Sequence, residues 1–167
     1  MPETSELELE LHDATPPWLL NQLRAWMSDA GDKGHAYLVV SEDAEEASLF
    51  ARQLAMQRLC HDPQDGIACG QCQSCKAFLQ GTHGDLLLLQ VPEGKTAIGI
   101  DQVREATHFL QQTPLYGAAK LLLVRDADQI TLAAANSLLK PLEEPPGNAL
   151  VLLSTAEAWR LPPTVRS

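Results

Sequence analysis

Runs of consecutive apolar residues that alternate with helical patterns constrain the fold of this chain more than any other feature. Three runs, at 86–91, 121–124 and 149–154, consist largely of leucine and valine, and 36–40 is a shorter run of the same kind. Continuous apolar strands are typical of parallel sheets that are covered on both faces. We therefore expect an α/β fold with a doubly wound parallel sheet, right-handed crossovers and helices on both faces.

Helical patterns of apolar residues occupy the segments around these strands. The spacing predicts helices over 16–31, 43–59, 101–112 and 128–140, and a loop-rich insert over 60–75. Asp43 followed by Glu46 predicts a capping box at the start of the second helix. With 167 residues, of which 45% are hydrophobic, the chain is long enough for one domain with a sizeable core.

The net charge of −10 argues against one class of function. Because neutralising phosphates needs an excess of lysine and arginine, we do not expect free-standing, non-specific DNA binding. Residues 1–15 carry five acids and no base, which predicts a solvated, flexible acidic leader. No apolar run is long enough to span a bilayer, and the first residues lack the pattern of a secretory signal, so we expect a cytoplasmic location and no membrane partner.

All four cysteines lie within 16 residues, in the spacing C-x8-C-x2-C-x2-C: Cys60, Cys69, Cys72 and Cys75. Two residues between cysteines let both thiolates face one centre, and four thiolates form a closed tetrahedral shell for one structural Zn²⁺. Two disulfides and an iron–sulfur cluster are the alternatives. The missing secretory signal argues against disulfides, whereas spacing alone does not exclude the cluster. Since four thiolates complete the shell, we interpret His61 and His83 as surface or outer-shell residues.

The segment after the first strand is where a nucleotide-binding loop would lie. A P-loop needs glycines that let backbone amides approach phosphates, then a lysine and a serine or threonine. Laid over that pattern, Ser41 and Glu46 occupy the glycine places, Ala47 the lysine place and Ser48 the last position. The carboxylates of this loop would repel a polyanion. The sequence therefore predicts a degenerate P-loop with no ATP cofactor, no catalytic residue and no small-molecule substrate.

The end of the third strand is the place for the acidic residues of an ATPase. Arg125 and Asp126 would take the positions of the Mg²⁺-binding aspartate and the catalytic glutamate, so the metal carboxylate is replaced by a cation. A shift of one residue would instead make Asp126 and Asp128 an acidic pair. We interpret this segment as an N-terminal cap on the next helix.

The stretch 136–146 closely resembles the N-L-L-K-x-L-E-E-P-P signature of clamp-loader subunits, AAA+ proteins that open sliding clamps and load them onto DNA. The matching residues are Leu138, Leu139, Lys140, Leu142, Glu143, Glu144, Pro145 and Pro146. The segments 34–38 and 81–85 are similar to the family's entry to its first strand and to the turn after its zinc module. The cysteine spacing is also similar to the bacterial clamp-loader pattern.

This resemblance covers roughly residues 16–167 and implies an AAA+-like domain with a zinc module at 60–75. Zinc cysteines beside a degenerate P-loop are similar to the delta-prime type of subunit in bacterial DNA polymerase III, a non-catalytic scaffold that helps to load the clamp during replication. The implied partners are the gamma/tau and delta subunits, with the beta sliding clamp and primed DNA engaged by the assembly. The alternatives are an ATP-hydrolysing subunit of the gamma/tau type and a zinc-dependent DNA-binding module.

Two departures from the family pattern lead to further expectations. Pro141 has no N–H to bond the carbonyl of Ser137, so we expect the helix to stop or kink near Lys140. Family members end this domain with a Ser-Arg-Cys motif whose arginine reaches a neighbouring subunit's ATP. Ser167 would be the first residue of that motif, so we expect Arg166 and Ser167 at a subunit interface. We also expect this chain to be the first domain of a longer protein, with later domains absent from it.

Overall fold

Four parallel strands form the centre of the fold, as the apolar runs predict. In the computed structural model, which describes residues 15–30, 34–116 and 119–167, they lie in the order β1-β4-β3-β2. The strands are β1 (Ala36–Val40), β2 (Leu86–Leu89), β3 (Leu121–Val124) and β4 (Leu150–Thr155). Leu122 in β3 pairs in parallel with Leu87 of β2 and with Val151 of β4. The predicted parallel α/β sheet is confirmed.

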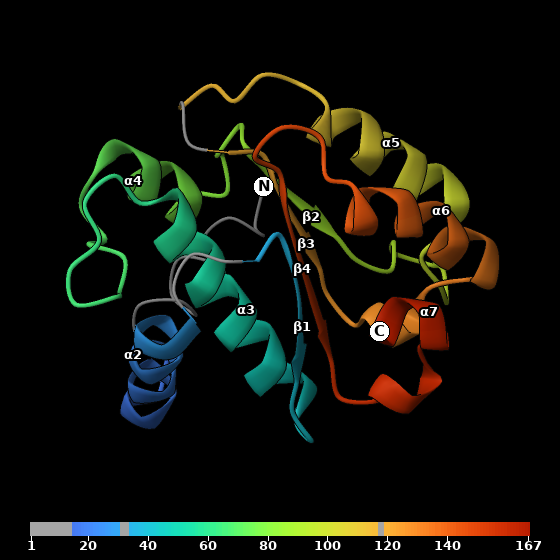
Figure 1. The fold of residues 1–167 in the computed structure, drawn as a ribbon, viewed down its shortest axis with the longest axis horizontal. Helices are drawn as coiled ribbons and strands as arrows, with labels where there is room; N and C mark the ends of the chain where they lie inside the picture. The colour runs from blue at the N-terminus through green and yellow to red at the C-terminus, as the bar shows by residue number, and fades with distance from the viewer. Residues whose placement is uncertain (1–14, 31–33, 117–118) are drawn as a thin grey trace.

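Helices cover both faces of this sheet. Figure 1 shows α2, α3 and α4 on one side and α5, α6 and α7 on the other. Their bounds are α2 (Pro17–Ala30), α3 (Ala44–Leu59), α4 (Gln73–Leu79), α5 (Ile100–Leu110), α6 (Leu132–Glu143) and α7 (Pro163–Arg166), with 3-10 turns η1 (Ala127–Gln129) and η2 (Ala158–Arg160). None of the helices in the described segments is long and apolar enough to cross a membrane.

Two hydrophobic clusters, one on each face of the sheet, form the core. Successive side chains of a strand point to opposite faces, so Leu121 and Leu123 pack with α3 and α4, whereas Leu122 and Val124 pack with α5 and α6. The central strands β3 and β4 are buried along their whole length, while the edge strands β1 and β2 are mostly half-buried. Full cover on both faces is therefore confirmed only for the two central strands.

The start of α3 confirms half of the predicted capping box. The Asp43 carboxylate accepts a hydrogen bond from the N–H of Glu45 at 2.9 Å, as an N-cap residue does. The N–H of Asp43, which Glu46 would bond in a capping box, instead donates to the hydroxyl of Ser41 at 3.3 Å.

Helix α6 begins and ends later than the sequence predicts. Its N-cap is Thr131, whose hydroxyl accepts from the N–H of Ala134 at 3.2 Å. The interpretation of Asp126 as a cap on a helix that starts at residue 128 is wrong: Asp126 has a left-handed backbone (φ 50°) and makes no capping bond through its side chain.

The sequence predicts a stop or a kink near Lys140. The stop is wrong, because α6 runs to Glu143 with Pro141 inside it, whereas the kink stays a prediction. A proline removes one hydrogen bond within the helix. Pro141 is buried, and the N–H of Glu144 still bonds the carbonyl of Lys140 at 2.8 Å. We attribute the continuous helix to this burial, together with that of Leu138 against the sheet. The predicted acidic leader lies, apart from Thr15, outside the described residues.

Candidate metal centre and strand-end region

The four cysteines converge on one point, and we call them the cysteine cluster. Their sulfur atoms all lie within 4.8 Å of one another. The Sγ atoms of Cys60 and Cys72 are 4.0 Å apart, and so are those of Cys69 and Cys75. A disulfide needs about 2.05 Å between sulfurs, and all four thiols are free. The cluster could therefore hold a metal ion.

Two helix ends and a tight turn bring these thiols together. Cys60 is the C-cap of α3, and Cys72 is the N-cap of α4, with its sulfur accepting from the N–H of Cys75 at 3.4 Å. Gly70 lies between them with φ 72°, a left-handed conformation that glycine adopts at low cost. The loop-rich interpretation of 60–75 thus missed the start of α4 at Gln73. The apolar stretch 77–79 was the signal for that helix.

Backbone amides aimed at the sulfurs favour thiolates in this cluster. Cys69 and Asp62 donate their N–H groups to the sulfur of Cys60 at 3.3 and 3.4 Å. Gln71 and Cys72 donate theirs to the sulfur of Cys69 at 3.4 and 3.3 Å. These last two bonds hold the pKa of the Cys69 thiol below its usual value.

Burial acts in the opposite direction on the cluster. It raises the pKa of the Cys60 and Cys75 thiols. Burial also raises the pKa of Cys72, but hydrogen bonds from the backbone of His61 and Cys75 and from the neighbouring thiols lower it more, to about 6. Since thiolates a few ångströms apart repel one another, a bound dication is what would let all four ionise together.

The chemistry and spacing of these donors fit Zn²⁺. With Zn–S bonds of about 2.3 Å, tetrahedral geometry places sulfurs about 3.8 Å apart. The observed separations of 4.0 Å for two pairs are close to this value. Four thiolates leave no coordination position for a reacting water, so such a site is structural.

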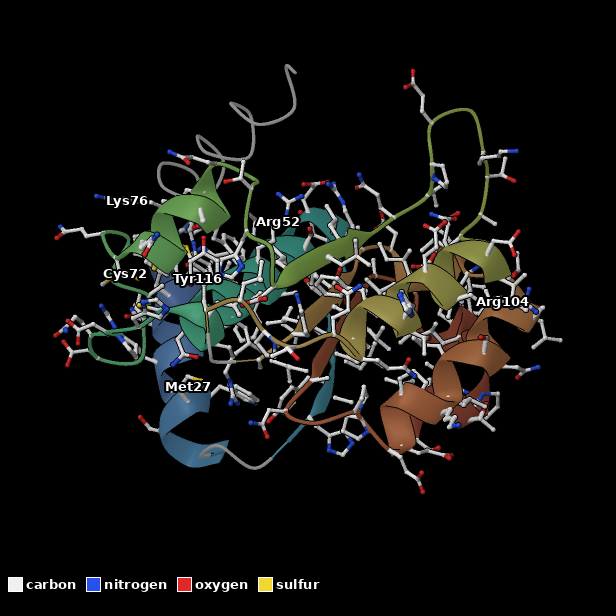
Figure 2. The ribbon with its side chains drawn as sticks, turned by 90° about the horizontal axis from the view of Figure 1, so that it is seen from above. Met27, Arg52, Cys72, Lys76, Arg104 and Tyr116 are labelled. Carbon is white, nitrogen blue, oxygen red and sulfur yellow. The ribbon has the colours of Figure 1, made fainter. Side chains whose placement is uncertain are left out.

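The two histidines near the cluster lie outside its group of sulfur donors, as expected. His61 is exposed, whereas His83 is buried and hydrogen-bonds Ser74, the residue before Cys75. Figure 2 shows Cys72 and Lys76 at one end of the molecule and Arg104 at the far end. The ring of Tyr116 lies 4.5 Å from that of His83.

The second region of interest, the strand-end region, comprises residues 41–48, 125–128 and 155 where β1, β3 and β4 end. Arg125, after β3, forms an ion pair with Glu45 in the first turn of α3. Its Nε also lies 3.7 Å from the carboxylate of Asp126. Burial raises the pKa of the Asp126 carboxyl. The charge of Arg125 opposes this shift, whereas the charges of Asp128 and Glu45 add to it, and the net shift is upward.

A second contact in the strand-end region joins Thr155, at the end of β4, to Asp128. The hydroxyl of Thr155 donates to the carboxylate of Asp128 at 2.5 Å, and the same hydroxyl accepts from the N–H of Glu157 at 3.0 Å. Asp126 and Asp128 therefore face different partners. Within the described residues, no group of three or more potential metal ligands forms around them.

The residues of the predicted family signature lie on the second half of α6 and in the turn that follows it. Leu138 is buried in the core, and the carbonyl of Leu142 accepts a hydrogen bond from His35 Nε2 at 2.9 Å. Arg166 and Ser167 lie beside this helix and line a cavity of about 400 Å³ together with its C-terminal residues. No partner chain is present, so their role at an interface stays a prediction.

Sequence reasoning missed a buried ion pair at the start of β2 and β3. The Nζ of Lys120 lies 3.0 Å from the carboxylate of Asp85, and both side chains are almost wholly buried. The carboxylate also accepts from the N–H groups of Leu115 and Tyr116 at 2.7 and 2.9 Å. Only the position of these charged residues next to apolar runs could have indicated it.

Comparisons with known proteins agree with this fold. The chain matches the model of the family described as "DNA polymerase III, delta subunit" over residues 18–167. It is 39% identical over 155 residues to DNA polymerase III subunit delta' of Escherichia coli (strain K12), and 37% identical over 153 residues to the Pseudomonas aeruginosa delta' subunit. Each match covers 90% of this chain and 46% of the relative, so the chain spans about half the length of these relatives.

A solved structure supports the fold separately. The gamma subunit-related protein of Thermotoga maritima aligns with 89% of this chain and 43% of its own, at a TM-score of 0.60 and 24% identity. This likeness agrees with the parallel α/β fold described above. Because the family model matches residues 18–167, the chain belongs to the DNA polymerase III delta-subunit family.

Proposed function

We propose that this chain is part of a clamp-loader subunit of the delta-prime type, which serves as a rigid, non-catalytic scaffold within DNA polymerase III. The family match and the delta' relatives support the type of subunit. The packing supports the scaffold role, because central strands that are buried under helices on both faces hold those helices in fixed positions. Without nucleotide chemistry, the subunit would lack the order–disorder switch that a bound γ-phosphate gives to other NTPases.

The observation that carries this proposal is the chemistry of the strand-end region. In open α/β sheets, ligands bind outside the carboxyl ends of the strands. At this place the chain presents carboxylates, and the guanidinium of Arg125 is already paired with Glu45. The positions that would serve the phosphates carry Ser41, Glu46 and Ala47. A triphosphate there would meet negative charge and few free donors, so we infer a degenerate P-loop.

The cysteine cluster is proposed to hold one structural Zn²⁺. When bound, the ion would neutralise the thiolates and fix the loop between α3 and α4. Among the residues near it, Lys76 is the base next to the cysteines, while Asp62 is acidic and exposed. This composition is poor for binding phosphates, which disfavours a zinc-dependent DNA-binding module.

The assembly and its context complete the proposal. Residues 16–167 would form the AAA+-like domain with the zinc module at 60–75, and further domains would belong to the same protein. Its partners would be the gamma/tau and delta subunits, with the beta clamp and primed DNA reached through the assembly in the cytoplasm. The exposed residues Arg166 and Ser167 would then lie at a subunit interface.

Calorimetric titration with Mg·ATP at millimolar concentration tests the scaffold proposal. We expect no saturable heat with the chain, and the same result after Glu46→Gln, which removes one acidic charge, leaves the pair between Arg125 and Glu45 in place, and restores no glycine or lysine. Saturable binding by the chain itself would overturn the proposal and favour the gamma/tau type of subunit. Tight duplex-DNA binding that falls steeply with salt would instead favour the DNA-binding module.

A further inference from the structure

Three buried hydrogen bonds run from the start of β2 to the last residue of α3, which precedes Cys60, and we call them the relay. The N–H of Asp85 donates to Nδ1 of His83 at 3.0 Å. The Nε2 atom of His83 lies 2.8 Å from the hydroxyl of Ser74, and that hydroxyl donates to the carbonyl of Leu59 at 2.6 Å. All four residues are buried, and Ser74 and Asp85 have no exposed surface.

The direction of every bond in the relay follows from its two ends. Because Nδ1 of His83 accepts from an amide, it carries no proton, so a neutral ring carries its proton on Nε2. The carbonyl of Leu59 can only accept, so the single hydroxyl proton of Ser74 goes there. Ser74 Oγ then accepts from His83 Nε2–H. Burial lowers the pKa of His83, which agrees with the neutral ring.

Two residues of the relay directly precede two of the four cysteines in the chain. Leu59 is the last residue of α3 and precedes Cys60, while Ser74 lies in the first turn of α4 and precedes Cys75. The hydroxyl of Ser74 thus joins the end of α3 to the start of α4. Cys60 follows the end of α3, and Cys75 lies in the first turn of α4. Hydrogen bonds outside the ligand shell help to orient the ligands of metal sites, and here they fix the residues that directly precede two of the cysteines.

We propose that Ser74 and His83 are positioning residues of the metal centre, which hold the Cys60 and Cys75 sulfurs at ligand spacing before a metal binds. The inference rests on the zinc site proposed above. The position of His83 is fixed by Asp85, whose N–H bonds His83 Nδ1. The Asp85 carboxylate is in turn held by the N–H groups of Leu115 and Tyr116 and by the ammonium of Lys120. The spacing of the sulfurs is thereby tied to the rigid edge of the sheet.

Four variants of the 167-residue chain separate the relay from general packing. Ser74→Ala removes the bridging hydroxyl, and His83→Asn is too short to reach Ser74. His83→Gln places an amide N–H near the position of Nε2 and so preserves the donor to Ser74. Lys76→Ala, on the exposed face of the same helix, is the matched control.

The measurement is Zn²⁺ affinity, by competition with a chromophoric chelator, together with the absorption spectrum of the Co²⁺ form. We expect Ser74→Ala and His83→Asn to bind Zn²⁺ about tenfold or more weakly, the usual range for lost second-shell bonds. Their Co²⁺ spectra should also change, which a simple loss of stability would not cause. His83→Gln and Lys76→Ala should stay within about threefold of wild type.

The possible outcomes distinguish this inference from the metal site itself. Equal affinity in all variants, or a His83→Gln variant as weak as His83→Asn, would overturn the positioning role while the metal site stands. A wild-type chain that binds no Zn²⁺ would overturn both. If far-UV circular dichroism shows that Ser74→Ala does not fold, the comparison of His83→Asn with His83→Gln tests the positioning role by itself.

Discussion

Replacing Lys120 by methionine removes one charge from the buried pair with Asp85 while keeping most of the apolar side chain. Both side chains are at most 3% exposed, so water cannot screen the carboxylate that remains. Removing one partner of a buried ion pair costs about 3–5 kcal/mol, because the other charge is left uncompensated. Two backbone N–H groups still bond Asp85, at 2.7 and 2.9 Å. We therefore expect the lower end of that range, about 3 kcal/mol.

Urea unfolding at pH 7, followed by far-UV circular dichroism, measures this change in the free energy of unfolding. A domain of this size is stable by about 5–15 kcal/mol, so the expected loss is a large and measurable fraction. The matched control is Arg104→Met, since Arg104 pairs with Asp101 at 3.4 Å on the surface, with 67% and 91% of the two side chains exposed. We expect the control to change stability by less than about 0.5 kcal/mol. A loss below about 1 kcal/mol in Lys120→Met would refute the reasoning, because it would mean that the pair is hydrated.

Three further predictions concern Asp85, the cysteine cluster and the start of α6. Burial raises the pKa of Asp85, but the N–H groups of Leu115 and Tyr116 and the ammonium of Lys120 lower it more, so the net shift is downward. Its stabilising effect is therefore complete above the unfolded value of about 3.9 and lost as pH falls through the lower folded pKa. A pH series of urea unfolding from 6 to 2.5 should show this loss. Lys120→Met should show a smaller loss over the same range, because without the ammonium the folded pKa of Asp85 lies closer to the unfolded value; identical profiles would contradict it. Cys72→Ser should lower the zinc content from one ion per chain and reduce stability while leaving the far-UV spectrum largely intact, and elemental analysis that finds one zinc in both proteins would contradict it. Thr131→Ala removes the N-cap of α6 and should cost about 1 kcal/mol in urea unfolding, whereas no change would show that the cap is dispensable.

The sheet could be predicted because its signal is local. Each strand is a run of apolar residues between turn signals, and a parallel arrangement follows from the helices between them. The bounds of β1 and β3 match the predicted ranges, and β2 and β4 differ by one or two residues at their ends. The convergence of the cysteines could be predicted for the same reason, since all four lie within one short segment.

The contacts between distant residues could not be predicted. The turn between α4 and β2 brings Ser74 to His83, nine positions further along the chain, and Arg125 pairs with Glu45 across 80 positions. Neither pairing leaves a spacing pattern, because the fold alone brings the partners together. The error at Pro141 has a different origin: helix propensity is a local quantity, and burial of α6 against the sheet outweighs it.

Native mass spectrometry of the chain with Zn²⁺ and millimolar Mg·ATP tests the central claim most directly, since each bound group adds its own mass. The account predicts one species, which carries a single zinc ion and no nucleotide at any ATP concentration. A nucleotide adduct that grows and saturates with ATP would contradict it, because the strand-end region would then accept the phosphates that its carboxylates should exclude.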